Sequence, residues 1–252
     1  MSKADRIYHI LNGDALLEQF PSTIEGEKIV FRECLVDGPL QGEDMDALLR
    51  NRCKFLTEVY QDFSVEDYAA QVVKELDKIK DLSADAIVNL RFEDDLFCQV
   101  NMWFTCFIIS NFTKARKVYL VRPKRLSYLG FGAYDHKGLE VLYAQRALVP
   151  NLESLAELWF AFQVNDVSLL KSWSNKVAVQ SPFIRKAVEA QLSRIDLVDD
   201  RHPKVILENI MSEVGTEDFG QIFKLFNESA PIYGFGDLQV LRLVNEIKNK
   251  TD

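Results

Sequence analysis

The first half of the chain alternates between short apolar runs and stretches with helical periodicity. The apolar runs, each of strand length, cover residues 6–11, 28–35, 85–92 and 117–121. The helical stretches are a short one from Ala15, residues 43–61, residues 65–80, and one that Asp94 or Asp95 caps and that ends near residue 112. Strands joined through helices pair in parallel, and a parallel sheet is covered on both faces. Residues 1–125 are therefore predicted to form a three-layer, Rossmann-like α/β domain.

The second half has a helical pattern almost throughout. A connector over residues 126–138 is followed by seven helical segments, at residues 139–148, 153–165, 167–176, 182–195, 203–214, 217–227 and 237–249. Pro182 and Pro203 stand where helices begin, and Gly215 stands where one ends. Residues 139–252 are therefore predicted to form an all-helical domain. Aromatic and aliphatic side chains at helical spacing are predicted to be core, namely Trp103, Phe104, Phe107, Ile108, Leu158, Trp159, Phe162 and Trp173.

Charge and composition argue against several classes of protein. The 252 residues carry a net charge of −8, which disfavours a broad surface for nucleic acid or anionic lipid. The three predicted helices over residues 203–249, with Gly215 in a turn, resemble a helix-turn-helix unit, but residues 203–252 hold five Lys or Arg against eight Asp or Glu. A DNA-reading surface is rarely acidic, so DNA binding is not expected.

The same composition predicts a cytoplasmic protein. The first ten residues lack the apolar core of a signal peptide, and the most apolar stretch, residues 97–112, is too short to span a bilayer comfortably. The four cysteines, at positions 34, 53, 98 and 106, show no zinc-type spacing, so they are interpreted as reduced packing residues.

Polar side chains follow three of the predicted strands at their carboxyl ends. Ligands bind there in open parallel sheets, because loops and helix N-termini converge on one crevice. Three of these residues are candidate catalytic groups: Asp14, His9 and Glu93. Seven more are candidate ligand-binding residues: Asn12, Gly13, Arg32, Asp37, Gly38, Asp95 and Gln99. Each also has a structural interpretation, such as Asp14 and Asp95 as helix N-caps, Asp37-Gly38-Pro39 as a turn, or Arg32–Glu33 as a solvated pair.

Four motifs resemble an uncharacterised bacterial family, the domain of unknown function eighteen thirty-five, with a helical C-terminal module. They are "HILNGD", "FRECLVDGP", "RFEDDLFCQVNMWF" and "IYGFGDLQV". The resemblance implies that the family's motif segments contain His9, Gly13, Asp14, Arg32, Asp37, Gly38, Pro39, Glu93, Asp95 and Gln99. Arg91 departs from the family, in which tryptophan is common at this position. The family has no established activity, so the resemblance points to a site and not to a reaction.

Known catalytic motifs fit poorly. Gly13-Asp14 resembles the start of the Gly-Asp-Ser motif of SGNH hydrolases, and Asp199 and His202 have that family's Asp-x-x-His spacing. The nucleophile position is Ala15, however, and a residue without a hydroxyl cannot attack. A dinucleotide-binding G-x-G-x-x-G and a P-loop are both absent from the sequence.

Three functional hypotheses remain open. The first is an enzyme acting on a phosphorylated or nucleotide-like small molecule, because helix N-termini and Arg32 suit an anion. In this hypothesis the nearby carboxylates suit a divalent metal ion, the one candidate cofactor. The second is a non-catalytic ligand-binding or regulatory module whose helical half transmits occupancy or meets a protein partner, including a second copy of the chain. The third is an interaction scaffold without a site.

Overall fold

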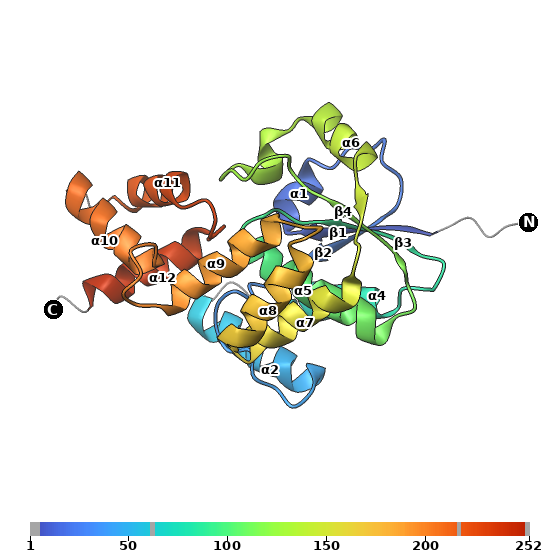
Figure 1. The fold of residues 1–252 in the computed structure, drawn as a ribbon, viewed down its shortest axis with the longest axis horizontal. Helices are drawn as coiled ribbons and strands as arrows, with labels where there is room; N and C mark the ends of the chain where they lie inside the picture. The colour runs from blue at the N-terminus through green and yellow to red at the C-terminus, as the bar shows by residue number, and fades with distance from the viewer. Residues whose placement is uncertain (1–5, 61–63, 216–217, 250–252) are drawn as a thin grey trace, which may run out of the picture.

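The computed structural model describes residues 6–60, 64–215 and 218–249, and it contains a five-stranded sheet (Figure 1). The strands are β1 (Ile7–Asn12), β2 (Glu27–Phe31), β3 (Ile87–Arg91), β4 (Lys117–Val121) and β5 (Ala147–Leu148). Their order is β2-β1-β3-β4-β5, and only β5 is antiparallel. The chain passes from β1 to β2 on one side and then to β3 on the other. The carboxyl ends of β1 and β3 therefore form a topological switch point.

The two faces of the sheet are covered unequally. Helices α1 (Asp14–Glu18) and α6 (His136–Ala144) lie over one face, as Figure 1 shows, while α4 (Lys74–Lys80) and α5 (Leu96–Phe112) lie over the other. The face under α1 and α6 has a small core of six buried residues: Leu11, Leu16, Val121, Phe131, Leu139 and Leu142. The face under α4 and α5 belongs to the main core, so this side contributes most of the apolar burial.

The connection from β2 to β3 holds two further helices. They are α2 (Met45–Phe55) and α3 (Val65–Tyr68), and π-helical turns over Leu56–Tyr60 and Ala69–Val73 extend them. Asp44 caps α2 by accepting the Ala47 N–H, and Ser64 and Asp67 form a capping box on α3. These caps satisfy amide groups that a helix leaves unpaired at its N-terminus, which explains why α2 and α3 begin where they do.

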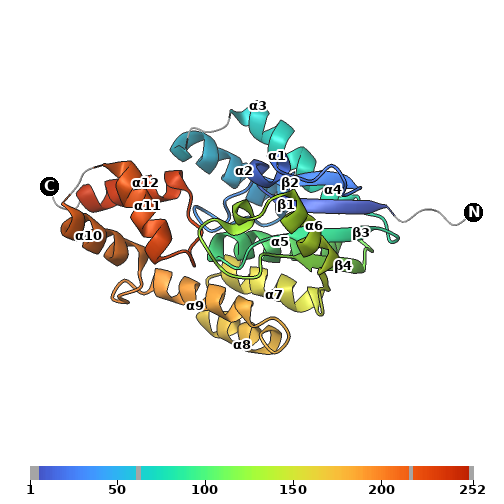
Figure 2. The ribbon, with the colours of Figure 1, turned by 90° about the horizontal axis from the view of Figure 1, so that it is seen from above.

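The remaining helices follow β5. They are α7 (Leu152–Gln163), α8 (Val167–Val177), α9 (Phe183–Ile195), α10 (Pro203–Val214), α11 (Phe219–Ser229) and α12 (Asp237–Lys248). Helices α7 and α9 pack against α5, so this part of the helical half is joined to the α/β body. Helices α10, α11 and α12 pack on one another at the end of the molecule opposite the N-terminus (Figures 1 and 2).

The predicted fold class, a parallel α/β region followed by a helical region, is confirmed. Most predicted boundaries differ from the observed ones by one to three residues, and two differ by four. The helix predicted over residues 139–148 ends at Ala144, because residues 147 and 148 pair with β4. The strand predicted to reach residue 35 ends at Phe31. The next two residues form ion pairs, Arg32 with Asp14 and Glu33 with Arg52. Residues 61 and 217, at the ends of two predicted helices, lie outside the described residues. No helix in the described ranges is long and apolar enough to cross a membrane.

Candidate functional site

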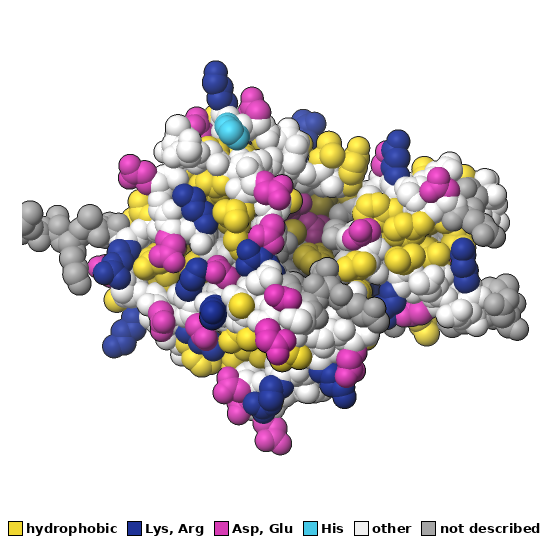
Figure 3. Space-filling model, turned by 180° about the vertical axis from the view of Figure 1, so that it is seen from behind, with side chains coloured by type: hydrophobic (Ala, Val, Ile, Leu, Met, Phe, Trp, Pro, Cys, Tyr) yellow, Lys and Arg dark blue, Asp and Glu magenta, His cyan; other side chains and the backbone are white. Residues whose placement is uncertain are grey.

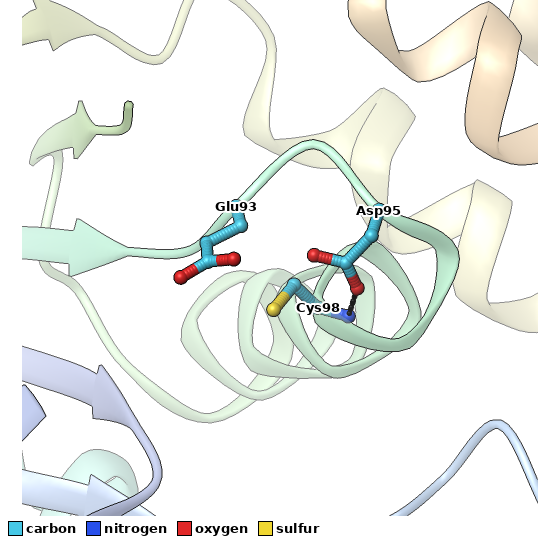
Figure 4. Close-up of side chains that lie close together, drawn as sticks. All are labelled: Glu93, Asp95 and Cys98. Carbon is cyan, nitrogen blue, oxygen red and sulfur yellow. Dashed lines mark hydrogen bonds between the residues drawn. The ribbon is translucent and has the colours of Figure 1, made fainter. Parts of the chain in front are cut away.

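Two carboxylates and a thiol converge where β3 meets α5. One ligand atom each of Glu93, Asp95 and Cys98 lies within 4.8 Å of the other two. Figure 4 shows the Glu93 carboxylate at the end of the strand, the Cys98 sulfur below it, and one oxygen of Asp95 pointing toward Glu93. This group, called the acid–thiol cluster below, lies at the sheet edge where the sequence predicted a site.

Local structure explains why these three side chains meet. Asp95 is the N-cap of α5, and its Oδ1 accepts the Cys98 N–H at 2.8 Å. An N-cap side chain and the residue three positions later lie on the same side of the first helical turn. Glu93 is held from another direction, because its Oε1 accepts the Phe131 N–H at 2.8 Å.

Two glycines press against the two carboxylates. A Cβ on Gly130 would lie 1.9 Å from Glu93 Oε2, and a Cβ on Gly234 would lie 2.0 Å from Asp95 Oδ1. Both glycines have positive φ, +50° and +62°, which other residues rarely adopt. Each begins a Gly-Phe-Gly triplet, at residues 130–132 and 234–236. Two copies of one short motif, about a hundred residues apart, therefore form the walls of the acid–thiol cluster.

Within the described residues, no positively charged side chain pairs with the carboxylates of the acid–thiol cluster. Burial, and then the charges of Asp95 and Asp94, raise the pKa of Glu93 to about 7. Burial also raises the pKa of Asp95 to about 6, although two hydrogen bonds from Cys98 oppose the shift. The pKa of the Cys98 thiol lies well above its ordinary value for the same reasons. Among the described residues neither Glu93 nor Asp95 forms an ion pair, whereas the intervening Asp94 is bonded to Arg122 at 2.6 Å. A cation at this point would relieve the repulsion.

Three amide side chains surround the acid–thiol cluster. Asn12, at the end of β1, donates from Nδ2 to Cys98 Sγ at 3.0 Å and accepts from Asn101 at 2.9 Å. Asn101 also donates to the main-chain oxygen of Glu33 at 2.8 Å, which links the ends of β1 and β2 to α5. Gln99 is fully buried and donates to the main-chain oxygen of Glu93 at 2.6 Å. Its Oε1 has no partner in the described part of the chain, which leaves an unpaired acceptor beside the cluster.

A cavity of about 260 Å³ lies over the ends of β1 and β2, and Asn12, which donates to Cys98, is one of its lining residues, whereas the three residues of the acid–thiol cluster are not. Its walls include four of the predicted residues: Asn12, Gly13, Asp14 and Arg32. The surface is hollowed between the part that carries α10–α12 and the rest of the molecule, and acidic side chains lie in and around the hollow (Figure 3). We refer to the 260 Å³ space as the strand-end cavity.

Asp14 and Arg32 form an ion pair at the strand-end cavity. Arg32 donates from Nε and Nη2 to the two carboxylate oxygens, both at 2.7 Å, and from Nη1 to the main-chain oxygen of Gln71. Asp14 was predicted to be the N-cap of α1, and this is wrong: Gly13 is the N-cap and Asp14 is the first helical residue. Asp14 is available for Arg32 because its carboxylate makes no capping bond.

We expect Asp14→Asn to change the free energy of unfolding by about 0–1 kcal/mol, because its side chain is 51% exposed and exposed pairs contribute little. Gly13→Ala should cost more, about 1–3 kcal/mol, since φ 93° and ψ 168° fall in a region that essentially only glycine adopts. A Cβ there would meet nothing within 4 Å, so the loss reports backbone strain alone. Urea denaturation measures the free energy of unfolding of both variants. A larger loss in Asp14→Asn than in Gly13→Ala would contradict this prediction.

Asp37 and Gly38 take part in packing and in a link to the C-terminal helices. Asp37 accepts hydrogen bonds from Arg242 of α12 and from the Tyr60 hydroxyl. Gly38 has φ +83° and lies under the Phe55 ring, where a Cβ would come within 2.4 Å of a ring carbon. The structure therefore places Asp37 beside a different cavity from that of Asp14, and it gives Gly38 a packing position.

His9 lies apart from the other candidate residues. It is fully buried in the middle of β1, on the face under α1 and α6, and its Nε2 lies 3.0 Å from the main-chain oxygen of Glu25. Burial lowers its pKa to about 4. Its Nδ1 is 3.4 Å from Nε of Arg91, which is also fully buried and lies over the Phe20 ring. His9 therefore belongs to a packed layer and does not reach the acid–thiol cluster.

The expected anion site at the helix N-termini is closed. Helix α1 has only five residues. At the start of α5, the Leu96 N–H donates to Ile232 O at 2.7 Å and the Phe97 N–H donates to Tyr233 O at 3.2 Å. Asp95 satisfies the Cys98 N–H, so the first turn of α5 has no amide left for a phosphate.

Sequence reasoning missed several residues that build this region. Cys98 was interpreted as a packing residue, although the Asp95-x-x-Cys98 spacing puts its sulfur beside an N-cap carboxylate. Gly130 and Gly234 were not considered, and the repeated Gly-Phe-Gly triplet was the available signal. Gln239, which lines the strand-end cavity, and Arg242, which holds Asp37, carried no local signal of this role.

No family model, no curated protein and no solved structure matches the chain. The resemblance to the bacterial family described above therefore stays a prediction. The observations that bear on function are the positions of Glu93, Asp95 and Cys98 and of the strand-end cavity.

Proposed function

We propose that the protein is a metal-dependent enzyme acting on a phosphorylated or nucleotide-like small molecule, with a divalent cation held by Glu93, Asp95 and Cys98. The observation that carries the proposal is the convergence of these three side chains at the switch point of a parallel sheet. Ligands of open α/β sheets bind at this place. The unpaired Oε1 of the buried Gln99 is a second observation in its favour, because the Nε2 of the same amide donates to the main-chain oxygen of Glu93 and buried acceptors without a partner are rare.

The set of ligand atoms favours a cation of intermediate softness. Carboxylate oxygens alone suit Mg²⁺ or Ca²⁺, whereas a thiolate together with carboxylates suits Zn²⁺ and related transition metals. Three protein ligands would leave a coordination position for water or substrate, as catalytic zinc sites do. Such a cation can polarise a phosphoryl oxygen or lower the pKa of a bound water. Asn12 would orient the sulfur through its hydrogen bond, in the way that outer-shell partners of metal ligands do.

Cobalt(II) titration tests the metal site, because thiolate ligation to Co²⁺ gives a sulfur-to-metal charge-transfer band in the near ultraviolet. We expect the wild-type protein to show this band and Cys98→Ser to lose it. Glu93→Gln should bind Co²⁺ at least about tenfold more weakly, since removing even an outer-shell partner of a metal ligand costs 10–100-fold.

Two matched controls accompany this experiment. Cys53→Ser removes a cysteine that is only partly buried and lies outside the acid–thiol cluster. Asp94→Asn removes the carboxylate between the two ligand carboxylates, which is bonded to Arg122. Both controls should keep the band. A wild-type protein without the band, or a Cys98→Ser protein that retains it, would refute the metal site.

A second candidate function is a non-catalytic ligand-binding module, and one observation favours it. Ile232 and Tyr233, which precede α12, accept hydrogen bonds from the first turn of α5. Arg242, within α12, pairs with Asp37. Occupancy of the crevice could therefore be transmitted to α10–α12. Turnover assays on a panel of phosphate monoesters and nucleotides, with Zn²⁺, Co²⁺ or Mn²⁺ added, separate the two functions. Release of phosphate or of another product supports the enzyme, and binding without turnover supports the module.

A further inference from the structure

A second cavity, of about 140 Å³, lies beside the strand-end cavity, between α9, α12 and the beginning of α10. The polar and charged residues that line it are Asp37, Arg194, His202, Lys204, Gln239 and Arg242. Three of these side chains are cations and only one is a carboxylate. This is an unusual balance in a chain with a net charge of −8.

The ion pairs in this cavity leave one guanidinium uncompensated. Arg242 is paired with Asp37 and with Glu246, and Lys204 is paired with the other oxygen of Glu246 at 2.6 Å. Arg194 forms no ion pair with any described residue, and its Nε donates to the neutral Gln191 at 2.8 Å. Burial lowers its pKa, which marks a charge removed from water. A partly buried cation without a counter-ion is costly, so this position favours an anion.

His202 adds no charge to this balance. Its Nδ1 accepts the Lys204 N–H at 3.1 Å, and burial lowers the pKa of its ring. The imidazole is therefore neutral near pH 7. The charges in and directly around the cavity are then those of Arg194, Lys204 and Arg242 against those of Asp37 and Glu246, which leaves one positive charge.

Gln239 connects this cavity to the strand-end cavity. It lines both spaces, and its Nε2 donates to Cys34 Sγ at 3.2 Å while its Oε1 accepts the Gly236 N–H at 2.9 Å. The same short segment contains Gly234, which touches Asp95. One stretch of chain, residues 234–239, thus borders the acid–thiol cluster and both cavities. The two cavities share the wall at Gln239, whereas Glu93, Asp95 and Cys98 line neither of them, so a small molecule that occupies both cavities would contact Gln239.

We infer that Arg194, with Lys204 and Arg242, forms the phosphate-binding subsite of a small phosphate monoester whose organic part lies in the strand-end cavity. The identity of this ligand as the substrate rests on the proposed function; the anion site itself does not. The subsite supplies the positive charge that the strand ends do not offer, since Arg32 is paired with Asp14 and the first turn of α5 is closed. Guanidinium groups match phosphate oxygens in geometry as well as in charge.

Isothermal titration with inorganic phosphate tests the subsite directly. We expect the wild-type protein to bind phosphate and Arg194→Gln to bind it at least about tenfold more weakly, since hydrogen bonds between two charged groups are stronger than those between neutral ones. Arg185→Gln is the matched control, because Arg185 is an exposed residue of the same helix and lies outside the cavity. Arg194→Lys, which keeps the charge, should retain part of the affinity and shows that the fold tolerates substitution there. No phosphate binding by the wild-type protein, or equal losses in Arg194→Gln and Arg185→Gln, would overturn the subsite.

A second titration tests the connection between the cavities. Glycerol phosphate and a nucleoside monophosphate should bind more tightly than inorganic phosphate. Leu238→Trp, which fills the strand-end cavity, should remove this gain while leaving phosphate binding unchanged. Esters that bind no better than phosphate would overturn the assignment of the organic part of the ligand to the strand-end cavity.

The metal site can fail separately from the phosphate subsite: Cys98→Ser should lose the Co²⁺ band and keep phosphate binding. Phosphate binding without any Co²⁺ band would refute the proposed function and leave the subsite standing.

Discussion

Arg52→Ala should lower the free energy of unfolding by about 3–5 kcal/mol, because it leaves a carboxylate buried without its counter-ion. Arg52 and Glu33 have fully buried side chains, and Arg52 donates to Glu33 Oε2 from Nη2 at 2.9 Å and from Nε at 3.1 Å. Its guanidinium also donates to the main-chain oxygens of Cys34 and Asp37. The same substitution therefore also removes a hydrogen bond from each of these two carbonyl groups, although the Cys34 oxygen still accepts the Asp37 N–H at 3.1 Å.

Urea denaturation followed by circular dichroism measures this loss. Arg50→Ala is the control, because Arg50 is exposed on the same helix and its removal should change stability by about 0.5 kcal/mol or less. The double variant Glu33→Gln/Arg52→Met should be more stable than Arg52→Ala, since it leaves no charge in the core. A loss below about 1 kcal/mol for Arg52→Ala, or a double variant no more stable than Arg52→Ala, would contradict the prediction that an unpaired buried charge sets the loss.

Trp159→Ala should also cost about 3–5 kcal/mol, because it opens a large cavity in the main core. The indole is 1% exposed and lies 4.6 Å from the Phe104 ring centroid and 6.3 Å from that of Phe162. The contact with Phe104 joins α7 to α5, the helix that Asp95 caps and that contains Cys98. The sequence predicted Trp159 as a core residue, and the structure confirms it.

Trp173→Ala is the matched control for Trp159→Ala. The Trp173 side chain is only partly buried, and Lys176 lies over its ring with Nζ 4.0 Å from the centroid. Its truncation should therefore cost clearly less, since the stability lost follows the apolar area removed from burial and the cavity left behind. Equal losses for the two tryptophans in urea denaturation would show that burial does not set their contributions.

Much of the fold could be predicted because local signals agree with one another. The four parallel strands combine apolar runs with helices between them, and only one topology class accommodates that alternation. The end of β2 could not be predicted in the same way. Cys34, Leu35 and Val36 continue the apolar run, and the strand stops because Arg32 and Glu33 find ionic partners on distant segments.

The candidate site was predicted in part for a similar reason. Asn12, Glu93 and Asp95 come together because the carboxyl ends of neighbouring parallel strands meet. His9 does not join them, since side chains alternate along a strand and residues 9 and 12 face opposite sides of the sheet. The sequence alone was therefore enough to predict that His9 does not lie beside Asn12. The contribution of Gly234 and Arg242 could not be predicted, because contacts that span more than a hundred residues leave no periodicity to read.

The position of Gly234 late in the chain has a consequence for biosynthesis. Translation delivers Asn12 and Asp95 long before Gly234, and N-terminal regions begin to fold while the rest is being made. Until residues 232–239 emerge, the Leu96 and Phe97 amide groups lack the carbonyl groups that accept from them, and the Asp95 carboxylate lacks the cover of Gly234. The cavity that Gln239 borders is likewise open during this interval. A nascent α/β body thus lacks the segment that covers its strand ends, and it acquires that cover only after residues 232–239 have been made.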